Sequence, residues 1–394
     1  MISEKYNIPV LIRNTTRVSH QRAIVELGQV KERNAISHGK FVKDNKRFVT
    51  LPPRVLEMKK ELLEKIKKIG IDAEKSSINQ IINQNRLGKD KIGIITSGVS
   101  YLHVMESLKE LNLSLPVFKL GFFHPLPEQK IKSYIKKLKK VLIVEELEPF
   151  LQKEIERIAK ETNCKLEIFG KDVLSEIGEM KPEFVEQALL KILHKKPKIV
   201  KVKKLSVELA RRSPQMCPGC PYWLVVSAIK GAVDTKEVVF GGDIGCYMLL
   251  GSPQVGLQDY LLCMGSSIGL AHGIKKATGQ KLITFIGDST FFHAGLPALI
   301  NAVFNGSNPL IIILANYTTA MTGHQPHPSV PLLPNAIDIE KTCRALGVKN
   351  LVSLAPDNQE EFKNKIREFM AKDEVSVIIS KKPCIFVKDK YAQK

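Results

Sequence analysis

The stretch "KLITFIGDS" (281–289), followed by "PLIIILAN" (309–316), decides the fold of this chain. Each stretch is an apolar run of strand length that ends in polar residues, as fully buried strands of parallel sheets do. Asp288 and Asn316 end the two runs and lie 28 residues apart, about the length of one strand–helix–strand unit. Such a unit brings both strand ends to the same edge of a sheet, where open α/β folds bind ligands. The sequence therefore predicts a ligand site that contains Asp288 and Asn316.

Strands and helices alternate on both sides of this pair, which predicts an α/β protein with doubly wound, mostly parallel sheets. Further strands are expected at 90–98, 115–121, 141–146, 164–170, 237–245 and 375–384. Helices are expected at 51–70, 100–112, 127–138, 150–162, 266–278 and 296–306.

The same pattern divides the chain into four regions. Residues 51–195 and 217–394 are each long enough to form a domain with its own core. Residues 196–216 are basic and are expected to form a linker. Residues 1–50 contain one strand-like run, "IPVLIR" (8–13), which is too little to make a domain by itself.

Composition excludes several classes of protein. The longest apolar runs are too short to cross a bilayer, and the first residues lack the basic and apolar regions of a signal peptide, so we expect a cytoplasmic protein. Seven scattered cysteines do not form a disulfide framework. The net charge of +20 comes from lysines spread along helices without interleaved aromatic residues. This favours a solvated surface, anionic cofactors or an acidic protein partner over nucleic acid.

The polar strand ends are typical of a site for Mg²⁺ and diphosphate. Carboxylate, amide and carbonyl oxygens are ligands that Mg²⁺ prefers, and diphosphate oxygens complete its octahedron. Gly287 lets the chain turn so that phosphates can approach. Gly265, Gly269 and Gly273 recur at intervals of four near the start of a predicted helix, whose N-terminal amides could receive phosphate. The same spacing also fits close helix packing, so both interpretations stay open.

Longer strings carry a resemblance to a known family. The strings "GDIGCY" (242–247), "MGSSIGLAHG" (264–273), "GDSTFFHAGLPALINAVFN" (287–305) and "NYTTAMTGHQPHP" (316–328) resemble the thiamine-binding domain in the large (alpha) subunit of indolepyruvate:ferredoxin oxidoreductases. Three others resemble the middle of the same subunit: "PVLIRNTTRVSH" (9–20), "FHPLPEQKI" (123–131) and "VLIVEELEPF" (141–150). The resemblance covers nearly the whole chain.

This resemblance implies a domain assignment and a set of site residues. Residues 1–50 would be a remnant of a pyrimidine-binding domain with a linker, 51–195 an α/β domain like the C-terminal domain of transketolase, and 217–394 the thiamine diphosphate-binding domain with its transketolase-like fold. Asp288, Asn316 and the Thr318 carbonyl would hold Mg²⁺. The implied cofactor-binding residues are Asp243, Ile244, Gly245, Gly265, Ser266, Gly287, Asp288, Ser289, Asn316, Thr318, Thr322 and Gly323.

The cysteines in "CPGCPYW" (217–223) form a Cys-x-x-Cys pair, with Cys246 and Cys384 standing alone further on. The pair alone leaves a redox pair, a zinc site or unligated thiols open, although a zinc ribbon would need a second close pair. Related 2-oxoacid:ferredoxin oxidoreductases place four cysteines in this pattern around a [4Fe–4S] cluster. The resemblance thus implies that Cys217, Cys220, Cys246 and Cys384 are cluster ligands.

Other cysteines and the histidines carry weaker signals. We expect Cys164 and Cys343 to be packing residues, and Cys263 lies near the predicted cofactor site. His293 and His324 are candidate catalytic residues, and His327 falls in the same strings. The position of Tyr222 is commonly histidine in the family, so this tyrosine could alter a contact to diphosphate or substrate.

The resemblance implies oxidative decarboxylation of arylpyruvates to acyl-coenzyme A, with electrons passing through iron–sulfur clusters to ferredoxin. The family's large subunit also has a full pyrimidine-binding domain at its start and often a ferredoxin-like domain at its end. We therefore expect a second polypeptide to supply the missing parts, or a truncated chain, and a small (beta) subunit as partner. Two alternatives stay open: a non-oxidative thiamine diphosphate-dependent decarboxylase, and a catalytically incomplete cofactor-binding or assembly subunit.

Overall fold

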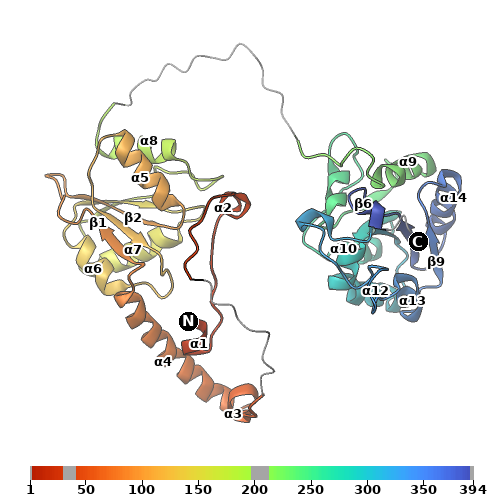
Figure 1. Cartoon of the computed structure of the whole chain (residues 1–394), viewed down its shortest axis with the longest axis horizontal. Coiled ribbons are helices and arrows are strands. Elements are labelled where there is room, and N and C mark those ends of the chain that lie inside the picture. The colour runs from red at the N-terminus through yellow and green to blue at the C-terminus, as the bar shows by residue number, and fades with distance from the viewer. Residues whose placement is uncertain (1, 30–40, 197–212, 391–394) are drawn as a thin grey trace. The chain divides into compact units, whose positions relative to one another are not determined.

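The computed structural model describes residues 2–29, 41–196 and 213–390 (Figure 1). The chain divides into two compact units, Met1–Lys204 and Leu205–Lys394. This division falls inside 196–216, the predicted linker, most of which lies outside the described residues. Each unit contains a five-stranded sheet among its described residues.

The sheet of the second unit has the order β6-β7-β8-β10-β9, and all its strand pairs are parallel. Its strands are β6 (Val239–Gly241), β7 (Leu282–Gly287), β8 (Leu310–Ala315), β9 (Asn350–Leu354) and β10 (Ser376–Lys381). Four of them fall in predicted strands, and β9 is a further edge strand that the pattern did not indicate. The prediction of a doubly wound parallel α/β fold is confirmed.

Two apolar layers cover this sheet because successive side chains of a strand point to opposite faces. Ile312 of β8 packs into one layer with helices α9 and α14, whereas Ile311 and Ile313 pack into the other with α10, α12 and α13. The continuous run of apolar residues in β8 therefore reflects burial on both faces. The helices of this unit are α9 (Tyr222–Ala232), α10 (Ser267–Thr278), α11 (Asp288–Thr290), α12 (Leu296–Phe304), α13 (Ile339–Ala345) and α14 (Gln359–Met370).

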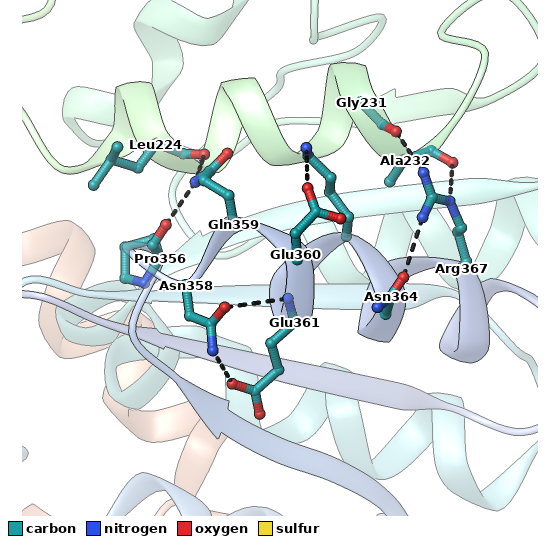
Figure 2. A network of polar contacts seen from close by, with 11 residues as sticks. Leu224, Gly231, Ala232, Pro356, Asn358, Gln359, Glu360, Glu361, Asn364 and Arg367 are labelled. Atoms are coloured by element: carbon teal, nitrogen blue, oxygen red, sulfur yellow. Dashed lines mark hydrogen bonds and ion pairs between the residues drawn. The ribbon is translucent and has the colours of Figure 1, made fainter.

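Polar contacts fasten α9 to α14 (Figure 2). Gln359, at the start of α14, donates to the Leu224 carbonyl at 3.0 Å and to the Pro356 carbonyl at 2.6 Å. At the other end the guanidinium of Arg367 donates to the Gly231 carbonyl at 2.7 Å and to the Ala232 carbonyl at 3.3 Å. These last carbonyls of α9 would otherwise lack partners, and a cation there also opposes the helix dipole. Both ends of α9 are thus held in place.

The first unit repeats the architecture with one antiparallel edge. Its sheet has the order β1-β3-β2-β4-β5, in which only β1 (Gln80–Ile82) runs antiparallel to its neighbour. The other strands are β2 (Ile92–Ser97), β3 (Val117–Leu120), β4 (Lys140–Val144) and β5 (Glu167–Phe169). Three of them lie within predicted strands, and β4 begins one residue before the predicted strand 141–146. The helices that cover it are α4 (Arg54–Lys75), α5 (Ser100–Glu110), α6 (Glu128–Ile135), α7 (Phe150–Thr162) and α8 (Pro182–Ile192).

The described part of the N-terminal region has short helices only: α1 (Ile2–Tyr6), α2 (Thr16–His20) and α3 (Asn45–Phe48). The strand-like reading of "IPVLIR" is wrong, because these residues pair with no strand and Leu11 and Ile12 are largely exposed. A strand needs a neighbour that accepts its backbone hydrogen bonds, and neither edge strand of the first sheet, β1 or β5, pairs with residues 8–13. Arg17 of α2 pairs with Glu179 at 2.6 Å.

None of the described helices is long and apolar enough to cross a membrane.

Candidate ion and cofactor site

The carboxyl edge of the second sheet gathers most of the predicted site residues. Asp288 directly follows β7, Asn316 follows β8, Asp243 follows β6 by two residues, and Cys384 lies just beyond β10. Since β7 and β8 are neighbours and parallel, Asp288 and Asn316 emerge side by side. The backbone N–H of Tyr317 joins them by donating to Asp288 Oδ2 at 2.8 Å.

Asp288 is buried and its two oxygens are used unequally. Its Oδ1 accepts one hydrogen bond, from the Ser289 N–H at 2.9 Å. Its Oδ2 accepts from the Tyr317 N–H and also lies 3.3 Å from Nε2 of the buried His327. A carboxylate offers about four lone-pair sites, so Oδ1 keeps acceptor capacity for a cation.

Asn316 is buried with its side-chain amide fixed in one orientation. Its Oδ1 accepts from the Thr318 N–H at 3.1 Å, and its Nδ2 donates to the Tyr222 hydroxyl at 2.8 Å. The chain reverses between Asn316 and Thr318 because Tyr317 adopts a left-handed backbone with φ of 65°. Such a conformation is strained for a residue with a side chain, and strained positions often occur at functional sites.

The oxygen donors in this corner fit a hard cation. Asp288 Oδ1 and Asn316 Oδ1 each accept one N–H and keep a lone pair, and the buried Nε2 of His327 lies 3.3 Å from Asp288 Oδ2 without forming a hydrogen bond. A carboxylate oxygen, an amide oxygen and a backbone carbonyl such as that of Thr318 are the donors Mg²⁺ takes. Among the described residues, no three His, Cys, Asp or Glu side chains are grouped closely enough to hold a metal ion by themselves.

Asp243 is bonded to the backbone around the site. Its fully buried carboxylate accepts three backbone N–H groups: those of Ile244 and Gly265 at 2.7 Å on Oδ1, and that of Ser267 at 3.0 Å on Oδ2. These bonds hold the turn that leads into α10. The carboxylate therefore stabilises the backbone around the site, and its contact with a cofactor stays a prediction.

The glycines at this edge leave room for neighbours. A Cβ on Gly265, where φ is +90°, would lie 2.3 Å from the Ala294 Cβ, so this position needs glycine. A Cβ on Gly287 or Gly245 would lie within 3.0 Å of the Tyr247 ring. Gly273, in contrast, has open space around it. Close packing thus explains Gly265 but not Gly273.

The entry to α10 is already bonded within the chain. The N–H groups of Gly265 and Ser267 donate to Asp243, and the Ser266 N–H donates to the Cys263 carbonyl at 3.1 Å. These three amides are therefore not free for phosphate, and the expectation that N-terminal amides of α10 receive phosphate stays a prediction for the next two residues, Ile268 and Gly269. The Ile244 carbonyl is likewise used, because the Tyr247 hydroxyl donates to it at 2.9 Å.

The loop after Asn316 contains the remaining predicted residues. Thr319 donates to the Ser289 hydroxyl at 2.9 Å, which ties this loop to the start of α11. Thr322 and Gly323 are exposed at its tip. The Thr322 hydroxyl and carbonyl both bond to Gln325, so the tip is held by its own side chains.

The histidines divide by burial. His293 lies exposed in a π-helical turn (Phe291–Gly295), and His324 lies exposed with its ring 5.8 Å from that of Phe386. Only His327 is buried in the corner with Asp288, and its Nδ1 lies 3.2 Å from the Ser329 hydroxyl. Sequence reasoning gave His327 no more weight than the other two, because the Pro-rich stretch around it carries no periodic pattern.

The four predicted cluster cysteines are neighbours at this same edge. Burial raises the pKa of the Cys220 thiol to about 11, and the charges of Cys246, Cys217 and Cys384 add to this effect. Burial also raises the pKa of Cys246, again with Cys384 and Cys217 nearby. The thiols are close enough to influence one another's pKa, but they do not lie close enough together in this structure to bind a metal ion.

The loop with Cys217 and Cys220 and the loop with Cys384 both line a cavity of about 510 Å³. It is lined by Pro218, Gly219, Pro221, Lys382, Pro383, Ile385, Phe386 and Lys388. The other cysteines lie apart from this group. Cys343 is buried in the core as expected, whereas Cys164 is exposed, so its assignment as a packing residue is wrong. Cys263 is exposed as well.

Together, the parallel sheet and the Asp288–Asn316 corner define an α/β domain with a polar site at the carboxyl edge of its sheet. Residues 243–380 match the family described as the C-terminal TPP binding domain of thiamine pyrophosphate enzymes. The chain is 39% identical over 398 residues to the indolepyruvate oxidoreductase subunit IorA of Methanothermobacter thermautotrophicus, 36% identical over 400 residues to that of Archaeoglobus fulgidus and 35% identical over 411 residues to that of Pyrococcus horikoshii. The predicted resemblance is confirmed.

These alignments cover 97–98% of this chain but 62–63% of the relatives, so the chain spans less than two thirds of their length. Among solved structures, a 2-oxoglutarate:ferredoxin oxidoreductase from Magnetococcus marinus is 15% identical, with a TM-score of 0.40 over 44% of this chain and 66% of that chain.

Proposed function

We propose that this chain is the thiamine diphosphate- and Mg²⁺-binding part of a 2-oxoacid:ferredoxin oxidoreductase that acts on indolepyruvate or a related arylpyruvate. The observation that carries the proposal is the corner formed by Asp288 and Asn316, two oxygen donors with unused acceptor capacity at adjacent parallel strand ends. The match of residues 243–380 and the IorA relatives support the choice of cofactor and reaction.

In this proposal each part of the corner has a task. Asp288, Asn316 and the Thr318 carbonyl hold the cation, which in turn neutralises the diphosphate. Asp243 keeps the Gly265 turn in shape, and Gly287 and Ser289 lie beside the cation. Bound thiamine diphosphate would supply a nucleophilic carbon for decarboxylation of a 2-oxoacid, while the protein orients it and shields it from water.

The four thiols would hold an electron acceptor beside this cofactor. Four cysteine thiolates are the usual ligands of a [4Fe–4S] cluster, and no histidine or carboxylate is part of the group here. The raised pKa values of Cys220 and Cys246 in the free chain indicate that iron must displace protons from these two thiols on binding. If the Cys217–Cys220 loop and the loop with Cys384 closed around a cluster, the cavity that both loops line would become narrower.

The proposal includes partners for the rest of the reaction. Coenzyme A would accept the acyl group and ferredoxin the electrons, while a small subunit would be a partner of this chain. A cytoplasmic location is part of the same proposal. A non-oxidative decarboxylase is the second candidate, but it would have no use for four neighbouring thiols at the cofactor edge.

The test combines the chain with the partner subunits under anaerobic conditions and supplies indolepyruvate, coenzyme A and methyl viologen. If the chain is part of an oxidoreductase, the dye should be reduced only when both indolepyruvate and coenzyme A are present. Release of CO₂ and aldehyde without dye reduction would favour the non-oxidative decarboxylase. Variants Cys217→Ser and Cys164→Ser separate the thiol group from an exposed cysteine elsewhere, and only the first should lose dye reduction.

A further inference from the structure

Tyr222 contacts the ion site from an unexpected direction. It is the first residue of α9, it is buried, and its hydroxyl oxygen accepts the Asn316 Nδ2 hydrogen bond at 2.8 Å. The Thr318 N–H donates a hydrogen bond to the oxygen of the same amide, Asn316 Oδ1. An amide can rotate by half a turn at little cost unless both ends are bonded. These two bonds together turn Oδ1, and not Nδ2, towards the cation corner.

The surroundings of Tyr222 keep its hydroxyl neutral and in place. Burial raises the pKa of Tyr222 well above its ordinary value, and the nearby charge of Asp288 acts in the same direction. Its ring meets the Tyr247 ring edge to face, with centroids 6.2 Å apart. The contacts between α9 and α14 at Leu224 fix the helix that carries Tyr222 (Figure 2).

Tyr222 also belongs to the cysteine loop. It follows Cys220 by two residues, in a turn where the Cys220 N–H donates to the Cys217 carbonyl and the Trp223 N–H donates to the Cys220 carbonyl, both at 3.1 Å. From the other cysteine loop, the Cys384 N–H donates to the Asn316 carbonyl at 3.0 Å. The side chain of Asn316 is thus held by Tyr222, which directly follows the Cys217–Cys220 turn. The backbone of Asn316 is held by Cys384.

We propose that Tyr222 is a positioning residue that fixes the Asn316 carboxamide as a cation ligand and ties its orientation to the Cys217–Cys220 loop. This inference rests on the proposed function, because it requires Asn316 to bind the cation. Loss of the Tyr222 hydroxyl leaves Nδ2 of Asn316 buried without a partner, and the amide is then free to rotate. Residues behind a metal ligand typically change metal affinity by about 10- to 100-fold when they are replaced.

The experiment measures binding of Mg²⁺ to the whole chain by titration calorimetry at saturating thiamine diphosphate. Tyr222→Phe should weaken Mg²⁺ binding by about tenfold or more. Tyr134→Phe is the matched control, since Tyr134 of the first unit is also buried and its hydroxyl bonds only backbone groups of Ile94 and Pro116. This control should leave Mg²⁺ binding unchanged.

A second readout separates positioning from general destabilisation. Mg²⁺ requires near-octahedral ligands, whereas Ca²⁺ tolerates irregular geometry. Tyr222→Phe should therefore lose more affinity for Mg²⁺ than for Ca²⁺, and it should cause no further loss in an Asn316→Ala background. If Tyr222→Phe fails to fold, Tyr222→His provides the same test with a ring that can still accept a hydrogen bond, and it should retain part of the affinity.

The outcomes are distinct. A wild-type chain that binds no Mg²⁺ with thiamine diphosphate would overturn the proposed function and this inference with it. A wild-type chain that binds, with Tyr222→Phe binding equally well or losing Mg²⁺ and Ca²⁺ to the same extent, would overturn the inference alone. A selective loss of Mg²⁺ that disappears in the Asn316→Ala background would support it.

Discussion

Replacement of Asp243 by asparagine tests how the site is built. The Asp243 carboxylate is fully buried and accepts three backbone N–H groups at 2.7 to 3.0 Å. In Asp243→Asn one carboxylate oxygen becomes an NH₂ group. The remaining oxygen can keep Ile244 and Gly265, but the Ser267 N–H then faces a second donor and loses its acceptor.

The size of the effect follows from these bonds. Hydrogen bonds to a charged group contribute about 1.5–3 kcal/mol each, and an unsatisfied buried N–H costs about 1–3 kcal/mol. The negative charge also lies at the N-terminus of α10, where it is favourable by about 0.3–1 kcal/mol. Because two bonds are weakened and not lost, we expect Asp243→Asn to lower the free energy of unfolding of the second unit by about 2–4 kcal/mol.

The assay uses the only tryptophan of the chain. Trp223 lies in α9 of the second unit, so its fluorescence during urea unfolding follows that unit. The urea midpoint should fall without a change in slope. Asp259→Asn is the matched control, because the exposed Asp259 accepts a single N–H, that of Phe240 at 2.7 Å, and asparagine can still accept it.

The control should change stability by less than about 1 kcal/mol. Equal midpoints for Asp243→Asn and Asp259→Asn would refute the assignment of Asp243 as the residue that holds the α10 turn.

Three further predictions concern the same edge. Gly265→Ala should destabilise the second unit by about 2–4 kcal/mol, because the new Cβ would clash with Ala294 and Gly265 has a left-handed backbone. Gly273→Ala should not destabilise the unit, because Gly273 has open space around it, and equal urea midpoints for the two variants would contradict this prediction. Cys220 has a pKa raised to about 11, so its alkylation by iodoacetamide should be slow at pH 8 and rise towards pH 11, as measured by mass spectrometry of peptides; rapid reaction at pH 8 would contradict its burial as a thiol. Anaerobically purified chain should contain about four iron atoms, and Cys384→Ser should lose most of them, whereas stoichiometric zinc without iron would support a structural metal instead.

The sequence predicted the parts of the structure whose signal is local. The apolar runs of β7 and β8 are long and end in polar residues, so both strands and the proximity of Asp288 to Asn316 could be predicted. Strand β9 ("NLVSL") was not predicted, because its polar residues break the apolar run. Strand β1 has only three residues and exists through its pairing with β3.

Contacts between distant segments could not be predicted from local pattern. Tyr222 lies 94 residues before Asn316 in the sequence, and its hydrogen bond to that amide depends on where α9 is packed. The same holds for His327 beside Asp288 and for Asp243, whose position at a strand end looks like that of a ligand. Only the tertiary structure shows that Asp243 accepts three backbone N–H groups, whereas Asp288 accepts two and lies beside His327.

The proposal that the Asp288–Asn316 corner binds Mg²⁺ and thiamine diphosphate is tested most directly by titration calorimetry. The affinity of the whole chain for thiamine diphosphate with Mg²⁺ is measured for the wild type, Asp288→Ala and Asp259→Ala. Asp288 supplies the carboxylate oxygen of the cation corner, whereas Asp259 is exposed and bonds only Phe240. We expect the wild type and Asp259→Ala to bind thiamine diphosphate in a Mg²⁺-dependent way. Asp288→Ala should keep its fold but show no detectable binding. Unchanged affinity in a folded Asp288→Ala chain would contradict the proposal.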